Sequence, residues 1–347
     1  MAKKDKKDEN EKPEEFDAEE VMKNLAKKYG NIMFSGQDIK DRPRLIVPST
    51  PNLDIANHGG IREGTWNLIS GKKKTGKTTL ALQIAANAQK MGKHIHYLNI
   101  EQRFDVKNLT TVRDLVTTPD KFTLYESTKG NILSAQKFLN LFYDICTDFP
   151  NSVVIIDSIS SLCSDNELSK DIGEAARPEG PKLFGQVCRK LASTVPINGM
   201  IVLGILHLIA NTSGYGPAFM EDGGNKIQYQ CDNKFLCKSI SSWENAKGRR
   251  IGQIVEWDVA FSANGAPAEK ATTFLRYGLG YDSVWEIVST AIELNLIVKT
   301  GAWFAFEDRE KNPVKCQGQD KVYDYFIQNP DLCEQLYAKV KELVCEE

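Results

Sequence analysis

The feature that most constrains the fold is a glycine- and lysine-rich segment between an expected strand and an expected helix. Residues 71–79 read GKKKTGKTT and fit the pattern GxxxxGK[ST]. A short apolar strand is expected before it at residues 66–69. A helix with one apolar face is expected after it at residues 78–90. A turn of this kind is typical of α/β proteins, in which strands and helices alternate around a parallel sheet.

The residue types in this segment suit the binding of a nucleoside triphosphate. Glycine lets the backbone curl so that its N–H groups point at phosphate oxygens, and the start of the helix adds a favourable dipole. Lys77 can reach the β- and γ-phosphates, and the Thr78 hydroxyl can ligate Mg²⁺. ATP and Mg²⁺ are therefore the predicted cofactors. The predicted nucleotide-binding residues in the segment are Gly71, Lys72, Lys73, Lys74, Thr75, Gly76, Lys77, Thr78 and Thr79. Lys72–Lys74 either reinforce the anion site or form a solvated crest of the loop.

Strand and helix patterns alternate along the chain to about residue 282. Residues 153–156 read VVII, an uninterrupted apolar run that indicates a strand buried on both faces. This alternation predicts a mostly parallel sheet. The other expected strands are 95–100, 122–125, 201–203, 257–261 and 273–275, the last two parallel or antiparallel, and a helix is expected around residues 133–142.

Polar residues follow three of these strands. Asp157 ends the strand at 153–156, where it either meets Mg²⁺, directly or through water, or simply caps the strand. Glu101 ends the strand at 95–100, where a carboxylate can orient or deprotonate a water that attacks the γ-phosphate. His207 follows the strand that contains residues 201–203, as a sensor of the γ-phosphate or as a structural histidine.

Residues 208–224 contain four glycines and one proline and predict a long mobile loop. Tyr215 and Phe219 are the aromatic residues of this loop. They either stack on bases of a nucleic acid or anchor the loop on the core.

The two ends of the chain differ from the middle. Residues 1–15 are nearly all charged and predict a disordered tail. A helix capped by Asp17 is expected at residues 17–29, and a short strand at 32–34. Helical periodicity dominates from about residue 283, which predicts a small second domain.

Composition excludes several classes of protein. The 347 residues carry a formal net charge of −2, so no global basic field indicates nucleic acid. The eight cysteines form no CxxC pair, and no apolar run is long enough for a signal peptide or a membrane span. We therefore expect a cytoplasmic protein with no membrane partner.

Taken together, these residues resemble the RecA family of recombinases from about Glu19 to Val344. The resemblance rests on the phosphate-binding segment and on five other stretches: NLDIANHGGIREG (52–64), YLNIEQRFD (97–105), VVIIDSISSL (153–162), EDGGNKIQY (221–229) and GAWFAFED (301–308).

The resemblance implies a RecA-type ATPase core with a mostly parallel, twisted sheet over residues 36–282. It implies an N-terminal oligomerisation helix and strand at 16–35 that dock on the neighbouring protomer, and a small α/β C-terminal domain at 283–347. It also implies a helical filament on single-stranded DNA, with ATP at the protomer interface, that pairs this DNA with a homologous duplex and exchanges strands.

Site residues carry over from the family one by one. Lys77 and Thr78 match the phosphate and magnesium positions, Glu101 the catalytic glutamate and Asp157 the second acidic position at magnesium. Asp105 matches a carboxylate near the adenine, although Asn108 stands where an aromatic residue is usual.

The resemblance also implies two DNA-binding loops, at about 165–178 and in the glycine-rich segment. The DNA-binding residues it implies are Lys182, Arg189, Tyr215, Phe219, Gly223 and Gly224. Tyr229 matches an aromatic residue that couples the second loop to the next subunit.

Two departures bear on function. His207 stands where bacterial members carry glutamine; the recombinase of phage T4 is similar in having histidine there, which favours a phage or other mobile-element origin. Phe261 and Ala263 stand where bacterial members have two lysines that reach the neighbour's ATP. This second departure keeps open a DNA-coating filament that uses ATP as a switch with little turnover. A hexameric helicase-like motor is disfavoured by the N-terminal docking element and the second domain.

Overall fold

The structure is a computed structural model. It describes residues 17–30, 32–174, 178–211, 215–216, 218–222, 225–245, 247–267 and 269–345. The predicted tail at residues 1–15, together with Gly223 and Gly224, lies outside these ranges. The described residues form two units, one ending at Arg44 and the other beginning at Leu45.

The N-terminal unit contains α1 (Ala18–Tyr29) and α2 (Gly36–Lys40). The Asp17 carboxylate accepts hydrogen bonds from two backbone N–H groups at the start of α1, and Gly30 ends the helix. The large apolar residues of α1 stay exposed: Val21, Met22, Leu25 and Tyr29. The strand expected at residues 32–34 is wrong, because this extended segment forms no strand. An extended segment becomes a strand only when another strand supplies hydrogen-bond partners.

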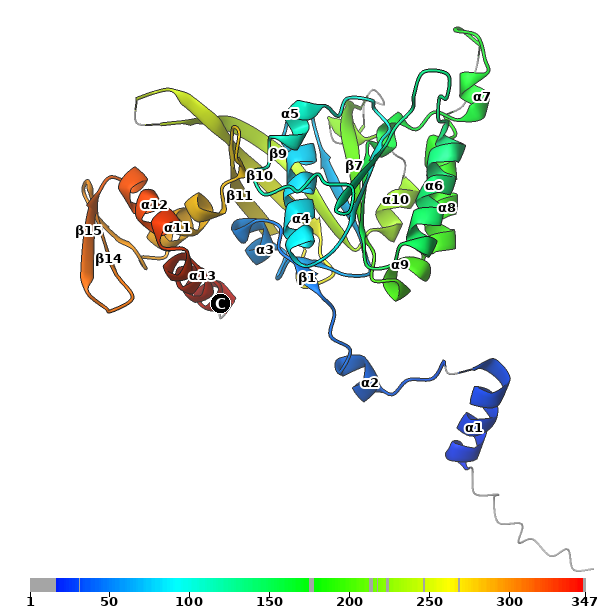
Figure 1. The fold of residues 1–347 in the computed structure, drawn as a ribbon, viewed down its shortest axis with the longest axis horizontal. Helices are drawn as coiled ribbons and strands as arrows, with labels where there is room; N and C mark the ends of the chain where they lie inside the picture. The colour runs from blue at the N-terminus through cyan, green and yellow to red at the C-terminus, as the bar shows by residue number, and fades with distance from the viewer. Residues whose placement is uncertain are drawn as a thin grey trace, which may run out of the picture. The chain divides into compact units, whose positions relative to one another are not determined.

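A large sheet organises the second unit (Figure 1). Its strands run in the order β12-β11-β10-β9-β3-β7-β6-β4-β5, and β8 pairs with β7. The neighbours from β9 to β5 are parallel, and those from β9 to β12 are antiparallel. The predicted mostly parallel α/β sheet is therefore confirmed. The strands are β3 (Thr65–Gly71), β4 (Ile95–Asn99), β5 (Phe122–Tyr125), β6 (Val153–Asp157), β7 (Ile201–Ala210), β8 (Phe219–Glu221), β9 (Asn233–Glu244), β10 (Arg250–Phe261), β11 (Glu269–Arg276) and β12 (Gly280–Tyr281).

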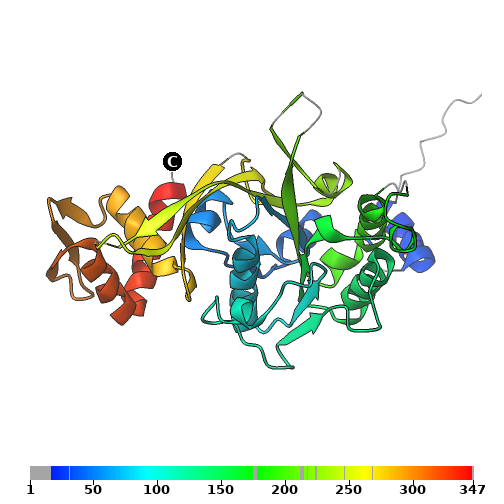
Figure 2. The ribbon, with the colours of Figure 1, turned by 90° about the horizontal axis from the view of Figure 1, so that it is seen from above.

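Helices cover both faces of the sheet (Figures 1 and 2). The apolar residues of α4 (Lys77–Lys90) pack on one face, and those of α6 (Ala135–Asp148) and α8 (Gly180–Leu191) pack on the other. Strand β6 contributes Val153 and Ile155 to the first cluster, and Val154 and Ile156 to the second. Burial of β6 on both faces confirms what its uninterrupted apolar run predicts.

Shorter elements complete the core. A two-stranded sheet pairs β1 (Ile46–Val47) with β2 (Ile61–Arg62). The short helices are α3 (Pro51–Ala56), α5 (Val106–Leu109), η1 (Ile159–Ser161), α7 (Asp165–Leu168), α9 (Thr194–Ile197) and α10 (Asn225–Gln230). Each described helix is too short or too polar to span a bilayer.

Two parts of the sheet differ from the sequence-based expectations. The loop expected at residues 208–224 is wrong at both its ends, because Leu208–Ala210 continue β7 and pair antiparallel with β8. The apolar residues of these ends favour a hairpin, and Gly216 lies between its two strands. Strand β9 was not expected, yet it lies between β3 and β10.

The C-terminal part follows β12. It packs α11 (Ser283–Glu293), α12 (Gln319–Gln328) and α13 (Pro330–Cys345) with a three-stranded sheet. The strands are β13 (Val298–Thr300), β14 (Trp303–Glu307) and β15 (Pro313–Gln317). The fully buried Glu286 of α11 joins this part to the core, because its carboxylate accepts from the backbone N–H groups of Asn52 (3.1 Å) and Phe274 (3.2 Å). The domain boundaries at residues 16, 36 and 283 stay predictions.

Candidate active site

The segment that connects β3 to α4 has the curled backbone that a phosphate-binding loop needs. Gly76 adopts a left-handed conformation with φ of +82°, immediately before α4. A Cβ atom at this position would lie 2.6 Å from the Tyr281 hydroxyl, so only glycine fits. A Cβ atom at Gly71 would lie 2.9 Å from the Thr75 hydroxyl. The two glycines therefore let the loop close tightly over the start of the helix.

Lys77 begins α4, with its amino group close to the loop. Its Nζ donates to the Lys72 carbonyl oxygen at 2.6 Å, and the side chain is almost fully buried. Burial lowers the pKa of Lys77, an effect that the nearby Asp157 carboxylate opposes. A phosphate in the loop would give this buried cation the anionic partner that a carbonyl oxygen only partly replaces.

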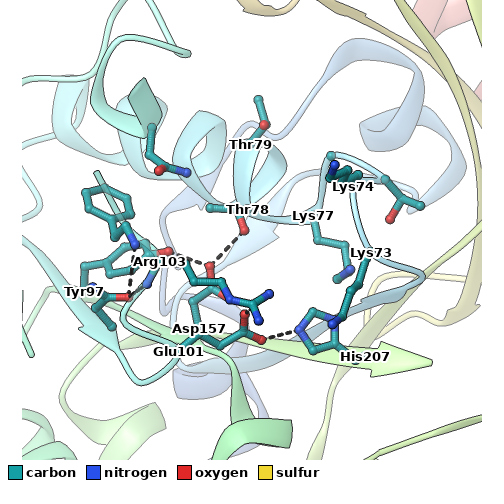
Figure 3. Close-up of a pocket in the computed structure, with 15 residues that line it drawn as sticks. Lys73, Lys74, Lys77, Thr78, Thr79, Tyr97, Glu101, Arg103, Asp157 and His207 are labelled. Carbon is teal, nitrogen blue, oxygen red and sulfur yellow. Dashed lines mark hydrogen bonds and ion pairs between the residues drawn. The ribbon is translucent and has the colours of Figure 1, made fainter. Parts of the chain in front are cut away.

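Thr78 and Asp157 meet at the floor of the site (Figure 3). The Thr78 hydroxyl donates to Asp157 Oδ2 at 2.8 Å, and the Tyr97 hydroxyl donates to the same oxygen at 2.6 Å. Burial raises the pKa of Asp157. A divalent cation beside this carboxylate would oppose the effect of burial, because it favours the ionised form. Two oxygen ligands from separate elements suit Mg²⁺, which commonly takes one or two protein ligands and completes its shell with phosphate and water.

Among the described residues, no group of three or more His, Cys, Asp and Glu side chains is placed to hold a metal ion. Thr78 and Asp157 fit Mg²⁺ as two oxygen ligands, beside which a bound phosphate would supply others.

Glu101 and His207 face each other beside this floor (Figure 3). Glu101 Oε1 is hydrogen-bonded to His207 Nε2 and accepts from the hydroxyls of Ser158 (2.8 Å) and Ser161 (3.3 Å). The His207 hydrogen bond is the main cause that lowers the pKa of Glu101 to about 2, against the opposing effect of burial. Glu101 is thus an anion at neutral pH, held in one orientation by three side chains.

These groups line one cavity of about 270 Å³. It brings together ten of the predicted residues: Lys73, Lys74, Thr75, Gly76, Lys77, Thr78, Thr79, Glu101, Asp157 and His207. The other lining residues are Tyr97, Asn99, Arg103, Phe104 and Asn108, which were not predicted. Tyr97 and Arg103 each lie within four residues of Glu101 in the sequence, and this proximity is the signal that could have indicated them.

Three predicted nucleotide-binding residues lie elsewhere. Gly71 is the last residue of β3, directly before the loop. Lys72 points away from the cavity, with its amino group 3.9 Å from the centre of the Phe219 ring. The Asp105 carboxylate caps α5 by accepting from the backbone N–H groups of Lys107 and Asn108. Asn108 lines the cavity in its place.

Comparison with known proteins decides the family. The family model of the RecA N-terminal domain matches residues 17–282, and that of the RecA C-terminal domain matches residues 285–344. The chain belongs to the RecA family. It is 25% identical to Protein RecA of Oleidesulfovibrio alaskensis over 95% of this chain and 93% of the relative. It is 27% identical to Protein RecA of Desulfovibrio desulfuricans over 96% of this chain and 91% of the relative. Both relatives are bacterial, so the phage origin stays a prediction.

Four of the DNA-binding residues predicted for this RecA-family chain lie within the described ranges. Lys182 and Arg189 are exposed on α8. Tyr215, which is 89% exposed, lies between β7 and β8, and Phe219 begins β8. Asn211 fixes this hairpin by donating from its backbone N–H to the Ala218 carbonyl (2.9 Å) and from its side chain to the Tyr215 carbonyl (2.6 Å).

Proposed function

We propose that this RecA-family chain is an ATP-dependent DNA recombinase. It forms helical filaments on single-stranded DNA, hydrolyses ATP with Mg²⁺, and catalyses homologous pairing and strand exchange in recombination and repair. The observation that carries the proposal is the position of His207. This residue contacts Glu101 in the cavity, and from the next residue, Leu208, the same strand, β7, pairs with β8. A movement of His207 caused by a change at the γ-phosphate would therefore pass along β7 to the predicted DNA-binding loop.

Each group has a role in the proposed hydrolysis. Lys77 and the backbone of the loop would bind the phosphates, while Thr78 and Asp157 would hold Mg²⁺, which when bound would neutralise phosphate charge. Glu101 orients the attacking water and accepts its proton. The water oxygen bonds to the γ-phosphorus as the bond from phosphorus to the bridging oxygen breaks, and that electron pair stays on ADP.

Exposed apolar residues support assembly into a filament. The apolar face of α1 has no buried residue, and Tyr229 on α10 is 88% exposed. In a filament, both surfaces would be covered by neighbouring copies. Lys182 and Arg189 present positive charge that would contact DNA phosphates.

The test is ATP hydrolysis with and without single-stranded DNA, beside electron microscopy of the same mixture with a slowly hydrolysed ATP analogue. The proposal predicts DNA-stimulated turnover and continuous helical filaments. Closed six-membered rings would indicate a helicase-like motor instead.

The ATP-switched coating filament remains the alternative because of two positions. Phe261 is 41% exposed, and Ala263 is exposed with no charged group. Neither can reach across to a neighbour's phosphate as lysine would. Filaments whose ATP turnover DNA does not stimulate would favour this alternative.

A further inference from the structure

Arg103 lies on a turn that directs it at the nucleotide cavity. The turn follows β4, and the Asn99 side chain fixes it by accepting from the backbone N–H groups of Arg103 (3.2 Å) and Phe104 (3.4 Å). Gln102 adopts a positive φ of 56° and donates to the Asn99 carbonyl at 3.0 Å. Beyond the turn, the Phe104 ring packs on Tyr97 with centroids 4.2 Å apart. Both ends of the turn are therefore anchored, and Arg103 extends from its middle.

The guanidinium of Arg103 lies beside the Glu101 carboxylate among the side chains that line the cavity (Figure 3). Its Nη1 is 3.3 Å from Glu101 Oε2, whereas the hydrogen bonds from His207 and Ser158 go to Oε1. An arginine has five N–H donors, and this single contact leaves most of them for another anion. The side chain is 67% exposed, so it can move at little cost.

A triphosphate in the cavity would benefit from a cation beside Glu101. Its γ-phosphate would lie between Lys77 and the anionic Glu101, and the two like charges would repel each other. Phe261 and Ala263 offer no cation from a neighbouring copy. Among the described residues that line the cavity, Arg103 is the single arginine. A planar guanidinium can bind two phosphate oxygens at once, which an ammonium group cannot do in the same way.

We infer that Arg103 is a catalytic residue that acts within its own subunit, exchanging its contact with Glu101 for the γ-phosphate and stabilising the charge that develops there during hydrolysis. The inference rests on the proposed ATPase function and adds a residue to it. Arginines in this role contribute roughly 10³–10⁵-fold to turnover in other nucleotide hydrolases.

The test compares Arg103→Gln and Arg103→Lys with a matched control, Arg113→Gln. Arg113 is also an exposed arginine, but it lies outside the cavity. Two kinds of experiment are made on the full chain with single-stranded DNA. Steady-state hydrolysis gives kcat and KM for ATP, and equilibrium binding gives affinities for a non-hydrolysed ATP analogue and for ADP with aluminium fluoride, which mimics the transition state. The expected result for Arg103→Gln is a fall in kcat of about 10²-fold or more, with the affinity for the ATP analogue within about threefold of wild type. The preference for ADP with aluminium fluoride should fall by a similar factor.

The outcomes are separable. If charge alone matters, Arg103→Lys should have a much higher kcat than Arg103→Gln. A kcat less than tenfold above that of Arg103→Gln supports contact of the guanidinium with two phosphate oxygens. An Arg103→Gln variant with wild-type kcat, or with only a raised KM, overturns the inference. A loss of rate without a loss of preference for ADP with aluminium fluoride overturns it too, because Arg103 would then act only on the orientation of Glu101. Absence of turnover in the wild-type protein would instead refute the proposed function itself.

Discussion

Replacing Glu101 by glutamine tests the catalytic assignment most sharply. Glutamine keeps the shape of the side chain and an oxygen that can accept from Ser158, but it removes the negative charge and the proton-accepting group. A positioned base contributes about 10²–10⁴-fold to a rate, so kcat should fall by about that factor. The loss corresponds to about 3–5 kcal/mol of transition-state stabilisation.

Two other quantities should change little in Glu101→Gln. Affinity for ATP should stay within a few-fold of wild type, because Glu101 takes no part in the contacts of Lys77 and Thr78. Stability at neutral pH should fall modestly. A pKa lowered from 4.5 to about 2 corresponds to a ceiling of about 3 kcal/mol, and partial solvent access reduces the expected loss to about 1–2 kcal/mol.

The assay is steady-state ATP hydrolysis at saturating ATP and single-stranded DNA, with equilibrium binding of a non-hydrolysed analogue. Glu126→Gln is the matched control, since Glu126 also follows a strand, β5, and accepts from Asn99, but it lies outside the cavity. The reasoning is refuted if Glu101→Gln keeps kcat within threefold of wild type, or if Glu126→Gln loses as much.

Three further predictions concern the pH dependence of stability, the core and the DNA interface. Burial raises the pKa of Asp54 from 3.8 to about 7, so between these values the unfolded chain loses its proton while the folded chain keeps it. Asp54 therefore contributes a fall in stability of at most about 4 kcal/mol as pH rises across this window, and denaturant titrations of Asp54→Asn should show a decline smaller by this contribution. Lys93→Met should lower the free energy of unfolding by about 3 kcal/mol in the same titrations, because Lys93 is fully buried and pairs with Glu63 at 2.8 Å; a loss below 1 kcal/mol would contradict this. Lys182→Gln combined with Arg189→Gln should weaken DNA binding and reduce its dependence on salt concentration; an unchanged slope would argue against phosphate contacts at these residues.

The parts of the fold that the sequence predicts are those with a strong local pattern. The strand, loop and helix around residues 66–90 combine an apolar run, paired glycines and helical periodicity, and all three form as expected. The helices α11, α12 and α13 likewise follow their periodicity.

Strands with weak patterns were missed. In β9 the serines at positions 239, 241 and 242 leave few apolar residues, and the strand is held by its neighbours β3 and β10. The three strands of the C-terminal part are short and mostly exposed. Pairing with distant segments decides such strands, and no local pattern reports it.

The candidate site shows the same limit. Lys77, Thr78, Glu101, Asp157 and His207 could be predicted because each was expected to follow a strand or to begin a helix, although His207 lies inside β7 and Asp157 is the last residue of β6. The contact of Lys72 with Phe219 and the capping role of Asp105 depend on where side chains point, which residue spacing does not determine. The role of Arg103 also depends on the direction of its turn.

The most direct test of the proposed function is joint-molecule formation between single-stranded DNA and a homologous supercoiled duplex. With ATP and Mg²⁺, the wild-type protein should form joint molecules with the homologous duplex and none with a heterologous one. Lys77→Ala should form none with either. Coated single-stranded DNA that never pairs with its homologue, or undiminished pairing by Lys77→Ala, would contradict the assignment of this chain as an ATP-dependent recombinase.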